Sequence, residues 1–254
     1  MFPEFSIFNI IIPMYPLCVA TGFLFGTTVL YIDFHKQKKE DKVVFPLMCF
    51  AEIGVIIGGK LLFLIINFQQ LPKYFYKFGF LGLLNKTGYV FYGGLFGGIF
   101  AIYFFAKIYK YHFSESLINV LSITPLIHAF GRIGCFCSGC CYGIKYNGIL
   151  NVYMNNVRRF PVQLLEAFLL LLLFIILQYL FFTKRNFIIG VYFFSYGIIR
   201  FVCEFLRGDV TRGYIGLLSI SSWISLLCIG ISCIFFAKIF KNRMEISKDG
   251  IANT

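Results

Sequence analysis

The sequence predicts an all-α polytopic membrane protein with about seven transmembrane helices, organised as one integral membrane domain over residues 1–254. Composition is the first reason: 59% of the residues are hydrophobic, 20% are aromatic and only 13% are charged, whereas soluble domains carry roughly 25% charged residues. A chain this apolar cannot cover its surface with polar groups, so its apolar surface has to face lipid. The second reason is that its apolar runs are long enough to cross a bilayer.

Seven apolar runs approach the roughly 20 residues that a helix needs to cross the hydrocarbon core. They lack the two-residue alternation of barrel strands, and open sheet edges cannot face lipid, so each run is predicted as a helix. The runs span residues 10–32, 43–68, 88–106, 114–130, 162–182, 187–206 and 214–237.

The formal charge of +12 comes from basic residues that stand in short clusters between the apolar runs. This pattern favours lipid headgroups and the positive-inside rule over a nucleic-acid surface, so no nucleic-acid partner is expected. Lys and Arg are denser in 33–42, 107–113, 183–186 and the tail from Lys238 than in the alternate connections. The predicted N-terminus is therefore outside, the C-terminus is cytoplasmic, and the long connection 131–161 is outside.

Four cysteines crowd into seven residues of that connection: Cys135, Cys137, Cys140 and Cys141. A metal site is one interpretation, because Cys137 and Cys140 have C-x2-C spacing, but a second ligand pair at matching spacing is absent and no metal is assigned. Disulfides are a second, if the connection faces an oxidising compartment. The third is that the cysteines are small apolar fillers.

Three arginines lie within or beside apolar runs: Arg132, Arg200 and Arg207. Arginine at the centre of a bilayer costs roughly 2.5 kcal/mol or more, so it normally faces a polar cavity and has a partner; snorkelling to the interface is the alternative. Glu204 lies four residues after Arg200 and three before Arg207, on one helical face with both. A guanidinium near the headgroups also suits a lipid phosphate, which it can bind through two parallel hydrogen bonds.

Glycines repeat at a spacing of four in Gly93-Gly94 and Gly97-Gly98, and similar small residues occur at Gly54, Gly58 and Gly59. Small residues let membrane helices approach closely. These positions are predicted to form packing seams.

Taken together, the motifs resemble the prolipoprotein diacylglyceryl transferase family of bacterial inner-membrane enzymes. The family signature G-R-x-G-N-F-x-N-x-E-x-x-G is similar to residues 131–143, with Cys135 and Ser138 in place of the asparagines and Cys140 in place of the glutamate. Tyr92 stands where the family has a histidine before G-G-L. Further segments agree in order with family motifs: 14–17, 58–60, 92–95, 159–166 and 204–207.

The resemblance implies that the diacylglyceryl group of phosphatidylglycerol is transferred to the thiol of a lipobox cysteine, with glycerol phosphate released. It implies no cofactor. The expected partners are phosphatidylglycerol, the prolipoprotein lipobox segment and membrane lipids, and the expected location is the bacterial inner membrane.

Site residues follow from the same resemblance. Arg132 and Arg207 are expected to stabilise the leaving phosphate, because charge develops there as the C–O bond breaks. Tyr92 is expected to position the acceptor, and Cys135 or Cys140 is considered as a nucleophile that forms a covalent lipid intermediate, since Arg132 would favour a thiolate. The predicted substrate-binding residues are Arg132, Arg207, Glu204, Tyr15, Lys60, Gln163, Glu166 and Ser138.

Two alternatives stay open at this point. One is a transferase on the same scaffold with a different acceptor. The other is a non-catalytic lipid-binding or redox-sensing membrane protein, against which the presence of Arg132, Glu204 and Arg207 argues.

Overall fold

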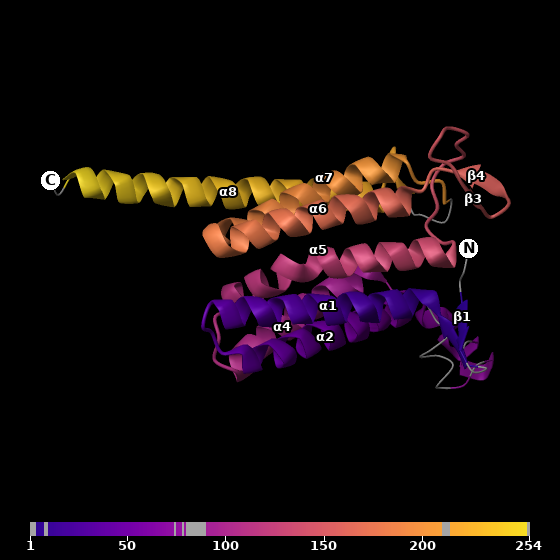
Figure 1. Ribbon diagram of the computed structural model, residues 1–254, viewed down its shortest axis with the longest axis horizontal. Coiled ribbons are helices and arrows are strands. Elements are labelled where there is room, and N and C mark those ends of the chain that lie inside the picture. The colour runs from indigo at the N-terminus through magenta and orange to yellow at the C-terminus, as the bar shows by residue number, and fades with distance from the viewer. Residues whose placement is uncertain are drawn as a thin grey trace. The chain divides into compact units, whose positions relative to one another are not determined.

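The computed structural model describes residues 4–7, 10–73, 75–77, 79, 90–209 and 214–252 and is built mainly of long helices (Figure 1). The α-helices are α1 (Met14–Lys36), α2 (Val44–Ile66), α4 (Phe91–Ile108), α5 (Phe113–Ser138), α6 (Val162–Thr183), α7 (Ile188–Phe205) and α8 (Ile220–Ala252). Short 3-10 turns are η1 (Asp41–Val43), η2 (Phe68–Gln70) and η3 (Arg185–Phe187).

Six helical segments of the described chain are long and apolar enough to cross a membrane, and Gly93–Ile108 is a shorter apolar helix. Backbone groups in lipid must be hydrogen-bonded within the segment, which a helix achieves alone. The prediction of an all-α polytopic membrane protein with about seven helices is confirmed.

Within the described residues, three short antiparallel hairpins flank the helices, and they were not predicted. β1 (Glu4–Ile7) pairs with β2 (Ile10–Pro13), β3 (Val152–Met154) with β4 (Val157–Arg159), and β5 (Tyr214–Ile215) with β6 (Leu218–Ser219). The β-branched residues before Pro13 favour an extended chain, so the first helix begins at Met14 and not at residue 10. The last helix begins at Ile220, after β6, and continues beyond residue 237.

The predicted end of the fourth helix at residue 130 is wrong, because α5 continues to Ser138. The signature residues from Gly131 to Cys137 are therefore helical and do not belong to a connection. The residue that follows the helix is Gly139, whose φ of +70° suits glycine. The Gly139 N–H donates to the Phe136 carbonyl at 3.2 Å and the Cys140 N–H to the Cys135 carbonyl at 3.1 Å, which is the Schellman pattern.

The chain forms two compact units, one made of Met1–Thr28 with Leu121–Thr254 and the other of Val29–Val120. The single-domain organisation stays a prediction. In the first unit, α5 and α6 share a buried cluster of Ala129, Ala167 and Leu170, and α7 packs against both α6 and α8. A Cβ at Gly134 would lie 3.2 Å from the Tyr15 Cα, so this glycine lets α5 approach α1.

In the second unit, α2 and α4 meet along the predicted glycine seam. A Cβ at Gly58 would overlap the carbonyl oxygen of Gly93, and one at Gly97 would overlap that of Gly54. These contacts between backbones explain why the seam holds no larger residue.

Candidate active site

A row of alternating charges crosses α5, α6 and α7 in the first unit. Arg132 Nη2 lies 3.0 Å from Glu166 Oε1, Arg200 Nη1 lies 3.6 Å from Glu166 Oε2, and Arg200 Nη2 lies 2.8 Å from Glu204 Oε2. Arg200 Nη2 also donates to Ser221 Oγ at 3.3 Å. All four charged side chains are largely buried, and the Glu166 side chain is only 2% exposed. One carboxylate, Glu166, therefore serves two arginines.

Arg132 has spare hydrogen-bonding capacity. Its Nε is buried and has no hydrogen-bond partner within the described ranges, and the same is true of Gln163 Oε1. Buried donors and acceptors normally find partners, so an unpaired one at this place needs an explanation. A bound anion is one explanation for a guanidinium whose Nε is unsatisfied.

Arg207 is one of the two arginines that Glu204 was expected to orient; Glu204 pairs with the other, Arg200, and Arg207 pairs with Asp209. Its Nε donates to Asp209 Oδ1 at 3.0 Å and its Nη2 to Asp209 Oδ2 at 2.7 Å. Burial alone would lower the pKa of Arg207, but the hydrogen bonds and charge of Asp209 outweigh it and raise the pKa. Arg207 lies beyond Phe205, the last residue of α7, so the spacing that puts two helical residues on one face no longer applies to it.

A backbone junction places the Arg207 segment beside the end of the signature. Gly143 forms an antiparallel bridge with Arg207, and the Ile144 N–H donates to the Leu206 carbonyl at 2.9 Å. A Cβ at Gly143 would overlap the carbonyl oxygen of Phe160 and lie 3.0 Å from that of Leu206. Only glycine fits where these backbones meet, which gives the signature's last residue a physical role.

The connection after α5 is held by side chains from two later elements. Gln163, at the start of α6, donates through Nε2 to the Cys140 carbonyl at 2.8 Å. Arg159, at the end of β4, donates through Nη1 to the Gly143 carbonyl at 3.2 Å and stacks on the Tyr142 ring at 4.0 Å. Gln163 thus has a structural contact in addition to its predicted role in substrate binding.

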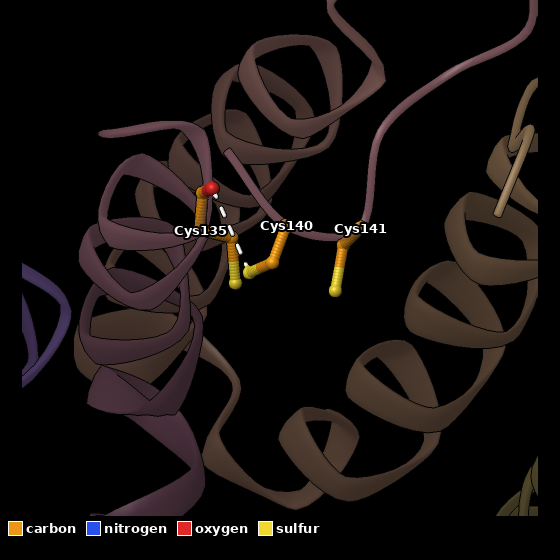
Figure 2. A group of neighbouring side chains, drawn as sticks. All are labelled: Cys135, Cys140 and Cys141. Carbon is orange, nitrogen blue, oxygen red and sulfur yellow. Dashed lines mark hydrogen bonds between the residues drawn. The ribbon is translucent and has the colours of Figure 1, made fainter. Parts of the chain in front are cut away.

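Three thiols converge where α5 ends. The sulfur atoms of Cys135, Cys140 and Cys141 all lie within 4.8 Å of one another, and Figure 2 shows the three side chains directed to the same side of the backbone. Cys137, which belongs to the C-x2-C pair, is not in this group. Two residues along a helix correspond to a rotation of about 200°, so Cys135 and Cys137 face opposite sides of α5.

The other predicted site residues fall in both compact units. Tyr15 is in the first turn of α1, next to Gly134, and Ser138 is the last residue of α5. Lys60 is buried in α2 of the second unit. Tyr92 is in the first turn of α4, and its side chain lies outside the described part of the chain.

Two residues of the site were missing from the predicted site residues. Arg200 shares Glu166 with Arg132, and Asp209 binds both Nε and Nη2 of Arg207. The four-residue spacing to Glu204 was a usable signal for Arg200. Asp209 carried no pattern of its own, because its contact depends on how the chain turns after α7.

The arrangement can bind an anion beside a group of thiols. Arg132 precedes Cys135 by three residues, so the two lie on one face of α5. Preorganised cations in a site of low polarity stabilise negative charge that develops on a leaving group. Sulfur atoms nearby supply nucleophilic or metal-binding chemistry.

Known proteins match this chain over nearly its whole length. Residues 4–238 match the family described as prolipoprotein diacylglyceryl transferase. A phosphatidylglycerol–prolipoprotein diacylglyceryl transferase of Clostridium tetani is 31% identical over 244 residues, covering 91% of this chain and 95% of that protein. The proteins of that name from Clostridium perfringens (transferase 2) and Rickettsia rickettsii are 30% and 31% identical, over 94% and 83% of this chain and 96% and 85% of their own lengths. The chain belongs to the prolipoprotein diacylglyceryl transferase family.

Proposed function

We propose that this protein transfers the diacylglyceryl group of phosphatidylglycerol to the cysteine thiol of a prolipoprotein lipobox. The family match over residues 4–238 and the names of the relatives support this activity. The observation that carries it is the buried, incompletely satisfied Arg132 on a membrane-spanning helix. An arginine in such a place is costly unless it faces a polar cavity and has partners, and Glu166 pairs with only part of this guanidinium.

Arg132 is the proposed phosphate ligand. Glu166 holds Nη2 of the guanidinium, and Nε stays available for a phosphate oxygen. Arg200 holds the other oxygen of Glu166, so we assign Glu166 and Arg200 as positioning residues for Arg132. As the C–O bond of the phosphodiester breaks, negative charge grows on the phosphate and the fixed guanidinium stabilises it.

Arg207 is proposed as a secondary cation in the same site. Asp209 already uses two of its donor nitrogens, so fewer donors are left for a substrate phosphate than on Arg132. Its positive charge still favours phosphate binding nearby. Tyr15, Ser138, Gln163 and Glu204 are proposed to line the donor side, and Lys60 and Tyr92 stay expectations from the family resemblance.

We also propose a location in the bacterial inner membrane with the N-terminus outside and the C-terminus in the cytoplasm. The bridge between Gly143 and Arg207 joins the connection after α5 to the one after α7, so both connections are at one end of their helices. The contact of Gly134 with Tyr15 brings the start of α1 to that end too. In a chain that crosses the membrane repeatedly, every second connection lies on the same side. The start of α1, the connection after α5 and the connection after α7 are therefore consistent with one side of the membrane.

The test combines the full-length protein, phosphatidylglycerol vesicles carrying a labelled diacylglyceryl group, and a peptide with a lipobox cysteine. Mass analysis of the peptide and of released glycerol phosphate reports donor, acceptor and bond together. Arg132→Ala is expected to lower transfer by about 100- to 1,000-fold, as loss of a preorganised charge partner does. Arg207→Ala is expected to lower it by roughly tenfold, the effect of losing one hydrogen bond to a charged group.

Arg185→Ala is the matched control. Arg185 lies in η3, after the opposite end of α6, and stacks on Phe181 at 4.3 Å. This variant should transfer at the wild-type rate. Wild-type transfer by Arg132→Ala, or an equal loss in Arg185→Ala, would refute the assignment of the phosphate site. A peptide that gains no mass with any variant or with wild type would refute the activity itself.

A further inference from the structure

The cluster of Cys135, Cys140 and Cys141 results from the way α5 ends. In the Schellman pattern the residue after the left-handed glycine returns to the last turn of the helix, where it contacts the residue five positions earlier. Here those two residues are Cys140 and Cys135, and the Cys140 Sγ lies 3.6 Å from the Cys135 carbonyl oxygen (Figure 2). The helix terminus therefore places the Cys140 thiol against the last turn of α5, beside Cys135.

The third sulfur depends on an unusual backbone conformation. Cys141 has a φ of +55°, a left-handed conformation that costs a non-glycine residue of the order of 1 kcal/mol or more and persists where surrounding contacts enforce it. Gln163 anchors the Cys140 carbonyl from α6, and Asn155 Nδ2 donates to the Gly139 carbonyl at 3.3 Å from the β3–β4 turn. Two separate elements thus hold the backbone just before Cys141, whose sulfur lies within 4.8 Å of the other two.

The spacing of the three sulfurs fits one small soft cation. Zinc binds thiolate sulfur at about 2.3 Å, and tetrahedral geometry then puts the sulfurs about 3.8 Å apart. The three atoms lie within 4.8 Å of one another before any ion is considered. The sulfur–sulfur distances need to shorten by roughly 1 Å at most to reach tetrahedral zinc geometry. The side chain of Cys140 is exposed, so it can move by that amount. Thiolates select zinc and copper(I) over the hard cations that prefer oxygen.

The charges around the cluster also suit a metal thiolate. Three thiolates and one divalent cation carry a net charge of −1, which an adjacent arginine offsets. The positive charges of Arg207 and Arg132 are near enough to act on the Cys141 sulfur. A structural zinc site would have four protein ligands, whereas this group has three among the described residues, the number that leaves a coordination position open.

We infer that Cys135, Cys140 and Cys141 bind one thiophilic divalent cation, for which zinc is the best match, and that its open position receives the acceptor thiol. The second half of this inference rests on the proposed function. The acceptor thiol gives its proton to water on binding, and its sulfur then attacks the glyceryl carbon that carries the phosphate. A C–S bond forms, the C–O bond breaks, and the electron pair of that bond leaves on the phosphate oxygen beside Arg132.

The metal half is tested first, without any measurement of activity. Full-length protein purified under reducing, oxygen-free conditions is incubated with zinc, passed through a desalting column and analysed for metal. Wild type should retain about one zinc ion per chain, the stoichiometry of a single three-sulfur site. Cys135→Ser, Cys140→Ser and Cys141→Ser should each lose it. Cys137→Ser is the matched control within the same seven residues and should keep it.

Cobalt replaces zinc as a spectroscopic probe of the open position. Cobalt-loaded wild type should show sulfur-to-cobalt charge-transfer absorbance, and a lipobox peptide should increase it as a further thiolate binds. The same peptide with serine in place of cysteine should leave it unchanged. In the transfer assay Cys140→Ser should lower the rate at neutral pH by up to about 30-fold, the factor between a full thiolate and a free thiol of pKa about 8.5.

Several outcomes would overturn the inference and leave the proposed function intact. One is a wild-type protein that transfers lipid but retains no zinc, or that loses zinc in Cys137→Ser as readily as in Cys140→Ser. Another is a disulfide between Cys135 and Cys140 or Cys141, found by thiol counting in the oxygen-free preparation. A third is a covalent lipid adduct in the intact mass of wild type that Cys140→Ser abolishes, which would make Cys140 a nucleophile. Zinc retention without transfer would instead refute the proposed function alone.

Discussion

Helices associate through different contacts in two regions of this protein: backbone contacts between glycines in one, and buried ion pairs in the other. Lipid tails are as apolar as leucine, so burial of apolar surface gives membrane helices little reason to associate. The pair α2 and α4 associates by close approach of backbones along Gly54, Gly58, Gly93 and Gly97. The group α5, α6 and α7 holds a row of buried charges in which Glu166 lies between two arginines. We therefore expect the first region to lose stability when a methyl group is added and the second when a charge is removed.

The two regions also differ in whether they can bind a substrate. The glycine seam contains backbone and small side chains, which can position helices but cannot bind a phosphate. Burying the charged row costs free energy. Buried charges of this kind are typical of sites where a ligand binds to the charge. The polar atoms of a membrane protein therefore indicate its site more directly than its most closely packed glycines do.

Removal of the shared carboxylate should have the largest effect. Glu166→Gln leaves the buried charges of Arg132 and Arg200 with one fewer partner, so the free energy of unfolding in detergent should fall by about 3–5 kcal/mol, and lipid transfer should fall with it. Thermal unfolding and the transfer assay measure the two effects. Glu115→Gln is the control, since that half-exposed glutamate pairs with Lys39 and should change stability by less than about 1 kcal/mol. Equal losses in both variants would contradict the shared-carboxylate role.

An added methyl group in the glycine seam should have the next largest effect. Gly58→Ala places a Cβ against the Gly93 carbonyl oxygen, a backbone atom that cannot rotate away. Overpacking of this kind should lower the free energy of unfolding by about 1–3 kcal/mol. Gly94→Ala meets the Val55 side chain at 3.3 Å, so its loss should be smaller. If unfolding experiments rank the two variants in reverse order, the seam does not depend on backbone contact.

The signature glycines should differ from each other although they are three residues apart. Gly134→Ala brings a Cβ within about 3.2 Å of the Tyr15 backbone and Cys18, and should lower stability by roughly 1 kcal/mol. Gly131→Ala meets only Val19, at 3.9 Å, and should be neutral or stabilising. The pair shows whether the charged region also depends on a close contact between helices. Equal destabilisation by both would mean that α5 does not pack on α1 as described.

The smallest expected effect is a gain. Gly230 lies within α8, and a Cβ there would meet no described atom within 4 Å. Gly230→Ala should therefore raise the free energy of unfolding by roughly 0.5–1 kcal/mol, because alanine loses less conformational entropy in a helix. Transfer should be unchanged. A loss of stability would indicate that another molecule or another part of the chain packs on this face of α8.

The membrane helices were predictable because hydrophobic length is a local property. A segment that crosses lipid must satisfy its own backbone, so a run of apolar residues is close to sufficient for the assignment. The ends were harder to place. The end of α5 depends on Gly139, a left-handed residue whose signal was obscured by the glycines at 131 and 134 earlier in the same segment.

The candidate site was predictable in its residue types but not in its pairs. Glu204 fits either Arg200 or Arg207 by spacing, and only the end of α7 at Phe205 decides for Arg200. The C-x2-C spacing singled out Cys137 and Cys140, whereas the turn after α5 joins Cys140 to Cys135 and Cys141. Spacing along a chain predicts a contact only while the chain stays in one regular element.

The sequence alone was enough to identify a multi-pass membrane protein with about seven helices and the family to which it belongs. These follow from hydrophobic length and from ordered motifs, which are properties of short segments. Tertiary structure alone decided that Glu166 holds Arg132 and Arg200 together, that Asp209 binds Arg207, and that three particular thiols meet. Such contacts join residues of different segments, so they depend on how helices face one another and where each one ends.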